Sequence, residues 1–101
     1  MIYFDNSATT KIFPEVLETY NTVSLDFFGN PSSLNSLGDA AFQVLETARK
    51  QVGHLLGVHP YEIYFTSGGS ESDNWAIKGT ALAKQAFGKH LITSSVEHPA
   101  V

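Results

Sequence analysis

Residues 62–74, Glu-Ile-Tyr-Phe-Thr-Ser-Gly-Gly-Ser-Glu-Ser-Asp-Asn, decide the fold class. The first five residues of this stretch are rich in β-forming side chains and predict a short strand over residues 62–66. The run Ser-Gly-Gly-Ser at residues 67–70 ends that strand, and a helix is predicted over about residues 71–87. A strand that turns directly into a helix is typical of proteins that alternate these two elements.

The same alternation extends toward the start of the chain. Pro14 can open a helix, because a missing backbone N–H costs nothing in the first turn, and apolar residues follow it at helical spacing. After a loop at residues 29–33, a strongly periodic helix is predicted behind Gly38 and Asp39, with Gly57 as its C-cap. The apolar face of that helix comprises Ala41, Phe42, Leu45, Ala48, Val52, Leu55 and Leu56.

A second short strand is predicted over residues 90–94, so helices and strands alternate along the chain. This order predicts an α/β protein with a mainly parallel sheet and flanking helices. Such sheets usually hold their ligands at the carboxyl ends of the strands. The polar clusters at residues 67–74 and 94–98 both lie at that end, which is the first indication of a binding site.

The Ser-Gly-Gly-Ser junction has the features of an anion site. Its glycines let the backbone approach a ligand, and the first N–H groups of the following helix point outward at the positive end of the helix dipole. Ser67 and Ser70 could add hydroxyl donors. No lysine follows the glycines and their spacing is wrong for a dinucleotide fingerprint, which excludes both common nucleotide motifs. The alternative is an ordinary turn, with Ser70 as N-cap and Asp73 completing a capping box.

His98 is the second candidate, because it follows the second predicted strand in a polar loop just before Pro99. An imidazole there can act as a base, a ligand or a flat stacking surface, or it can simply cap the loop. Asn6, Ser7, Thr9 and Thr10 could bind a ligand, but they are interpreted as satisfying their own backbone. The remaining histidines are not spaced for a metal site; they are His54, His59 and His90.

Composition excludes several classes of function. The chain has 101 residues, enough for one small domain, and its net charge of -4 without a Lys or Arg cluster argues against a nucleic-acid partner. No apolar run approaches the roughly 20 residues that span a bilayer, and the first residues lack the segments of a signal peptide. No cysteine is present, which excludes disulfides and thiolate metal sites and fits a cytoplasmic protein.

Four motifs together resemble the cysteine desulfurases, the branch of the class V aminotransferase-like enzymes that supplies sulfur for iron–sulfur clusters and tRNA thiolation. Each motif is weak alone, but their order and spacing from Tyr3 to Val101 are specific, and Ala-Ile-Lys-Gly at residues 76–79 also fits. The motifs are Tyr-Phe-Asp-Asn-Ser-Ala-Thr-Thr at residues 3–10, Gly-Asn-Pro-Ser-Ser at 29–33, Phe-Thr-Ser-Gly-Gly-Ser-Glu-Ser-Asp-Asn at 65–74 and Glu-His-Pro-Ala-Val at 97–101.

The resemblance implies the large domain of a fold-type-I enzyme that depends on pyridoxal 5'-phosphate (PLP). Residues 14–101 would be the first part of that domain, and residues 1–13 a leading segment that joins the small domain. Gly69 and Ser70 would hold the PLP phosphate, mainly through backbone N–H groups. His98 would stack on the pyridine ring and assist proton transfer.

This sequence departs from the family pattern at two places. The family usually has Gly-Ala-Thr where this chain has Gly-Gly-Ser at residues 68–70, a change that keeps both the backbone and the hydroxyl. Asn35 stands where the family often has a histidine.

The resemblance also implies groups that this chain lacks. The covalent PLP lysine, the acidic partner of the pyridine nitrogen and the sulfur-accepting cysteine lie further along the family's chains, and the context of Lys78, Lys84 and Lys89 does not match. The chain alone is therefore predicted to be inactive. In the family, further strands separate the two predicted here. Alone, the chain is thus expected to form a non-native sheet or to pair with copies of itself.

The intact enzyme would convert L-cysteine to L-alanine and an enzyme persulfide, and would pass the sulfur to an acceptor protein. It would be a homodimer without direct contact to nucleic acid or membrane. The alternatives are a related class V aminotransferase or selenocysteine lyase, or a non-catalytic domain that binds a phosphate-bearing ligand or a partner protein.

Overall fold

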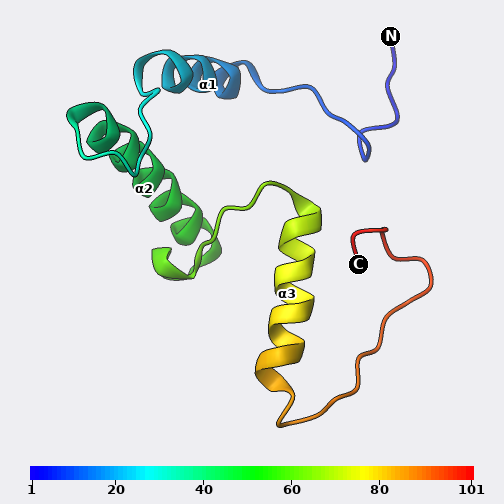
Figure 1. Cartoon of the computed structure of the whole chain (residues 1–101). Helices are drawn as coiled ribbons and strands as arrows, with labels where there is room; N and C mark the ends of the chain where they lie inside the picture. Colours follow the sequence, from blue (N-terminus) through cyan, green and yellow to red (C-terminus); the bar gives the residue numbers. More distant parts are fainter. The chain divides into compact units, whose positions relative to one another are not determined.

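The computed structural model describes all 101 residues and contains helices but no strand (Figure 1). The helices are α1 (Pro14–Asp26), α2 (Ser36–Leu56), the short 3₁₀ helix η1 (Pro60–Glu62) and α3 (Gly69–Lys84). The chain forms two compact units, Met1–Ile63 and Tyr64–Val101, which are described separately. No helix of the chain combines the length and the hydrophobicity needed to cross a membrane.

Helix α1 begins as predicted, with Pro14 in its first turn. Helix α2 begins earlier than predicted, because the Asn35 side chain accepts a hydrogen bond from the Gly38 N–H at 2.9 Å and caps the helix there. Gly57 ends α2 in the left-handed conformation, with φ at 67°, so its prediction as the C-cap is confirmed.

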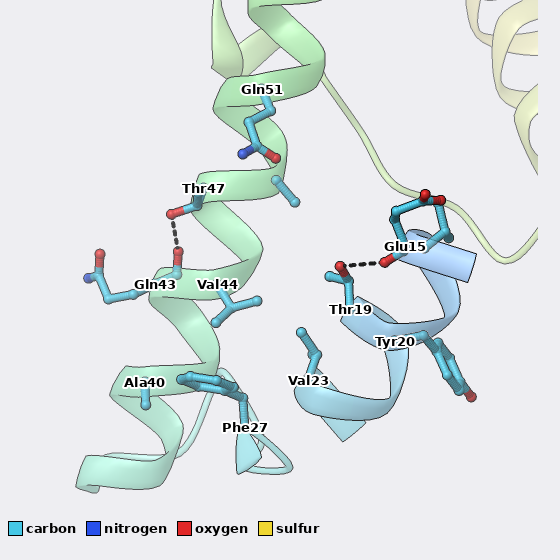
Figure 2. A pocket seen from close by; sticks show the side chains of 12 residues that line it. Glu15, Thr19, Tyr20, Val23, Phe27, Ala40, Gln43, Val44, Thr47 and Gln51 are labelled. Atoms are coloured by element: carbon cyan, nitrogen blue, oxygen red, sulfur yellow. Dashed lines mark hydrogen bonds between the residues drawn. The ribbon is translucent and has the colours of Figure 1, made fainter. Parts of the chain in front are cut away.

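Two groups of contacts organise the first unit. An apolar groove of about 900 Å³ lies between α1 and α2, and side chains from both helices, including Val23 and Val44, line it (Figure 2). At the other end of α2, Arg49 pairs with Glu46 at 2.9 Å and also donates to the Ile63 carbonyl, so the segment after η1 is held against the helix.

Helix α3 occupies most of the second unit. It begins at Gly69, two residues before the predicted start, and ends at Lys84 rather than at Phe87. After Gly88 the chain runs without regular structure, and its last residues return to the side of α3, where the Asn74 side chain donates to the Ala100 carbonyl at 3.4 Å (Figure 1).

The strands predicted over residues 62–66 and 90–94 are absent, and so is the non-native sheet predicted for the chain alone. Glu62 lies in η1, and residues 63–66 and 90–94 form no strand pair. The physical reason is that a strand needs a neighbour to complete its backbone hydrogen bonds, and neither segment has one within the chain. The β-forming composition was recognised correctly, but it predicts a strand only where a partner strand exists.

The chain buries almost no hydrophobic core of its own. Ala41, on the predicted apolar face of α2, is the only buried hydrophobic residue, at 7% exposed. Elsewhere on that face Leu45 and Val52 are half-buried, whereas Leu55 is exposed. In α3, Trp75 remains 56% exposed although it packs against Tyr64, with ring centroids 5.9 Å apart.

Candidate functional site

The start of α3 has no side-chain cap. Gly68 is the N-cap residue, and its backbone is extended. The first hydrogen bond of the helix runs from the Ser72 N–H to the Gly68 carbonyl at 3.1 Å. The N–H groups of Gly69, Ser70 and Glu71 therefore have no acceptor inside the helix, and they form a set of donors at the positive end of its dipole.

The space in front of these donors is open. A Cβ added to Gly68 or Gly69 would meet no atom within 4 Å, so the space beside both glycines is open. Ser70 lies in the first turn of α3 rather than at the N-cap, and no capping box forms with Asp73. The interpretation of this junction as a capping-box turn is therefore wrong.

The hydroxyl groups around the turn divide into bonded and free ones. The Thr66 and Ser72 hydroxyls share a hydrogen bond at 2.5 Å, and the one that does not donate in it can donate to the Gly68 carbonyl at 3.2 Å. The Ser67 hydroxyl is also bonded, to the Glu71 carboxylate at 2.7 Å. Of the two serines predicted to supply donors, only Ser70 therefore keeps its hydroxyl without a partner in the chain.

Glu71 closes the turn from the helix side. Its Oε2 accepts hydrogen bonds from the Ser67 N–H and the Ser67 hydroxyl, both at 2.7 Å. These bonds favour the ionised carboxylate, the backbone N–H more than the hydroxyl, and hold the pKa of Glu71 below its ordinary value. Glu71 thus fixes the peptide on one side of the glycines while the donors on the other side stay open.

His98 lies in a tight turn in the same unit. The Val101 N–H donates to the His98 carbonyl at 2.9 Å, with Pro99 at the position where a β-turn favours proline. The Ala100 N–H donates to the His98 Nδ1 at 3.1 Å. Because Nδ1 is the acceptor, the neutral imidazole carries its proton on Nε2. The backbone of the turn thereby selects one tautomer of the ring.

Asn74 connects the two candidate positions. Its Nδ2 donates to the Ser70 carbonyl at 2.8 Å and to the Ala100 carbonyl at 3.4 Å. The structure thus ties the first turn of α3, with Gly69 and Ser70, to the turn that carries His98. Three N–H groups with one free hydroxyl suit a phosphate group, and an imidazole of fixed tautomer is linked to the same turn.

Sequence reasoning missed the roles of Glu71 and Asn74. Both belong to the polar run at residues 67–74, which was recognised only as a whole. The spacing of Ser67 and Glu71, four residues apart across a helix start, could have suggested their bond. Nothing local in the sequence indicates the bond between Asn74 and Ala100, which are 26 residues apart.

The profile of a known family, aminotransferase class-V, matches residues 2–101. The chain belongs to the aminotransferase class-V family. Among its curated relatives, a NifS/IcsS protein homolog of Lactobacillus delbrueckii subsp. bulgaricus is 67% identical over 101 residues. The cysteine desulfurase IscS of Methanosarcina thermophila is 52% identical over 100 residues.

This aminotransferase class-V chain also resembles a solved structure, that of a NifS-like protein. The two share 40% sequence identity and a TM-score of 0.84 over 98% of this chain and 27% of the other. The chain spans about a quarter of the length of the curated relatives it matches, 26% and 25% of the two named above. The resemblance to cysteine desulfurases drawn from the four motifs is thus confirmed at the level of sequence.

Proposed function

We propose that this chain is the part of a PLP-dependent cysteine desulfurase that holds the PLP phosphate at Gly69 and Ser70 and carries the ring-stacking histidine, His98. The observation that carries the proposal is the uncapped, open start of α3 in the unit that also holds the His98 turn. The 52% identity to a protein named as a cysteine desulfurase supports this activity over others of the family.

The donors at the start of α3 fit the phosphate of PLP. The N–H groups of Gly69 and Ser70 would donate to the phosphate oxygens, and the Ser70 hydroxyl would add a further donor. The open space at the Gly69 Cα lets the phosphate approach the backbone closely. When bound, PLP supplies an electron sink for bonds broken next to the substrate's α-carbon.

His98 has a defined protonation chemistry in this turn. The neutral ring can donate its proton only from Nε2, because Nδ1 accepts the Ala100 N–H. A proton could be taken up only at Nδ1, with loss of that bond. His98 would therefore act as a flat face with a proton donor at Nε2, and the Ala100 N–H favours this tautomer of the neutral ring.

The remaining chemistry of the proposed reaction needs residues outside this chain. The C–S bond of L-cysteine breaks, the sulfur passes to an enzyme thiol as a persulfide, and the carbon skeleton leaves as L-alanine. This chain has no cysteine, so the thiol must come from another part of the enzyme. We place the enzyme in the cytoplasm as a homodimer that hands its sulfur to an acceptor protein.

The division at residue 13 belongs to the same proposal. Residues 1–13 contain no helix, and their side chains bond locally, as in the 2.5 Å contact between the Tyr3 and Thr9 hydroxyls. We propose that this segment joins the small domain and that α1 opens the large PLP-binding domain, residues 14–101.

The test is a chimera in which this chain replaces the matching 100 residues of the Methanosarcina thermophila enzyme. The chimera should bind PLP, seen by its absorbance, and release sulfide and L-alanine from L-cysteine. The 101-residue chain alone should hold PLP poorly, because none of its lysines lies in the matching context, and it should release no sulfide, because it has no cysteine. A chimera that folds like the parental enzyme but binds no PLP would refute the proposal, and so would sulfide release by the chain alone.

A further inference from the structure

Asn74 makes two hydrogen bonds to backbone carbonyls that are far apart in the sequence. It lies one turn after Ser70 in α3, and its Nδ2 reaches the Ser70 carbonyl at 2.8 Å and the Ala100 carbonyl at 3.4 Å. Asn74 and Ala100 are both partly buried, in a unit where most residues are exposed. The amide therefore spans from the start of α3 to the segment that returns beside it (Figure 1).

Ala100 is also hydrogen-bonded to the histidine. Its carbonyl accepts the Asn74 bond, and its N–H donates to the His98 Nδ1 at 3.1 Å. The turn is closed by the bond from the Val101 N–H to the His98 carbonyl at 2.9 Å. One residue of the turn thus contacts both the imidazole and the helix that carries Ser70.

We propose that Asn74 is a positioning residue that sets the His98 ring in register with the phosphate-binding turn at Gly69 and Ser70. This inference rests on the proposed function and deepens it, because it names the residue that links the two halves of the site. Asn74 itself would touch neither the phosphate nor the substrate. It would act by holding the Ala100 peptide, and through that peptide both the place and the tautomer of the imidazole.

The length of the bond between Asn74 and Ala100 indicates whether its loss will affect stability or turnover more. At 3.4 Å, the bond to Ala100 is near the long limit for an N–H···O contact, so it contributes little to folding. Placement of a catalytic group is far more sensitive, because a misplacement of about 1 Å can cost about a hundredfold in rate. Removing Asn74 should therefore lower turnover more than it lowers stability or phosphate binding.

The variant that tests this is Asn74→Ala in the chimera. Asp73→Ala is the matched control, since Asp73 is the neighbouring helical residue with similar burial. Asn74→Gln keeps an amide donor on a longer side chain and should restore part of the effect. Three quantities are measured: kcat for sulfide release, the Kd of PLP by absorbance titration, and hydrogen exchange of the Ala100 amide in the PLP-free protein.

We expect kcat to fall between about tenfold and a hundredfold in Asn74→Ala, with the PLP Kd within about threefold of the unsubstituted chimera. The hydrogen-exchange rate of the Ala100 amide should rise in Asn74→Ala and should stay the same in Asp73→Ala. The inference is overturned if kcat stays within about twofold, if Asp73→Ala has the same effect, or if Ala100 exchange does not change. Failure of PLP binding by the unsubstituted chimera would refute the proposed function instead, while the exchange of Ala100 would still decide the role of Asn74.

Discussion

The two long helices of this chain begin in opposite ways. Helix α2 is capped by Asn35, whose side chain accepts a hydrogen bond from the Gly38 N–H at 2.9 Å. Helix α3 begins after Gly68 and has no side-chain cap. A side-chain cap satisfies one of the donors that an anion would use, while an uncapped helix start keeps all of them available. The chain's own side chain thus covers part of the start of α2, whereas the start of α3 stays open, as the proposed phosphate site requires.

Glycines near the two helix starts differ in the same way. A Cβ on Gly38 would lie 2.2 Å from the Ser33 carbonyl oxygen, so the loop packs directly against the helix backbone. A Cβ on Gly69 would meet nothing within 4 Å. The first glycine is required by the protein's own packing, and the second leaves room for something outside the chain.

Substitution of His98 should give the largest effect, and on activity alone. In the chimera, His98→Ala removes the stacking face and the Nε2 proton donor, and turnover should fall by about 10²–10⁴-fold, the usual contribution of general acid–base assistance. Thermal unfolding should stay near that of the unsubstituted chimera, because His98 is exposed. Near-normal turnover of His98→Ala would mean that His98 only caps its loop.

Gly38→Ala should give the largest effect on stability. The new methyl group meets the Ser33 and Asn30 carbonyls and the backbone must shift, which for overpacking costs typically about 1–3 kcal/mol. Urea unfolding of the chimera measures the loss, with Gly69→Ala as the matched control at an open position. Equal stability of the two variants would remove the distinction between the two helix starts.

Gly69→Val and Ser70→Ala separate the backbone donors from the hydroxyl donor. The valine side chain would fill the open space and keep a phosphate away from the N–H groups, so the PLP Kd should rise by about tenfold or more. Loss of the Ser70 hydroxyl removes one hydrogen bond of about 1 kcal/mol, or about fivefold. If PLP occupancy is the same in Gly69→Val as in the unsubstituted chimera, the phosphate does not bind at this turn.

Glu71 should show the smallest effect, a shifted titration. Its pKa is lowered by the hydrogen bonds from Ser67, so the stabilisation of the turn is fully present above the unfolded value of about 4.3. It is lost as the pH falls through the lower, folded value. NMR titration of the Glu71 carboxyl should give a midpoint below that of an unstructured glutamate, and Ser67→Ala should move it upward. An unshifted midpoint would mean that the turn does not hold this bond in solution.

The helices could be predicted from the sequence because their signals are local. Pro14 and Gly57 each act through their own backbone conformation, and the apolar period of α2 is contained within the helix itself. The start of α2 was misplaced because the cap at Asn35 lies just before the periodic pattern. The strands could not be decided from composition, because a strand needs a partner strand, and residues 63–66 have none in this chain.

The candidate site was predicted in part for the same reason. Gly69, Ser70 and His98 stand out by residue type and by the ends of the elements that carry them. The bond between Asn74 and Ala100 depends on how the chain returns to α3 after Gly88, and no local pattern specifies that return. A side-chain pair such as Ser67 and Glu71 can be predicted only when the first residue of the helix is known.

The near-absence of a core has a thermodynamic consequence. With Ala41 as the only buried hydrophobic residue, unfolding of the 101-residue chain would expose little additional apolar surface to water. The heat capacity of unfolding scales with that surface and should therefore be small, and the transition should spread over a wide temperature range like the melting of separate helices. In a calorimeter the isolated chain should show a gradual slope without a heat-absorption peak.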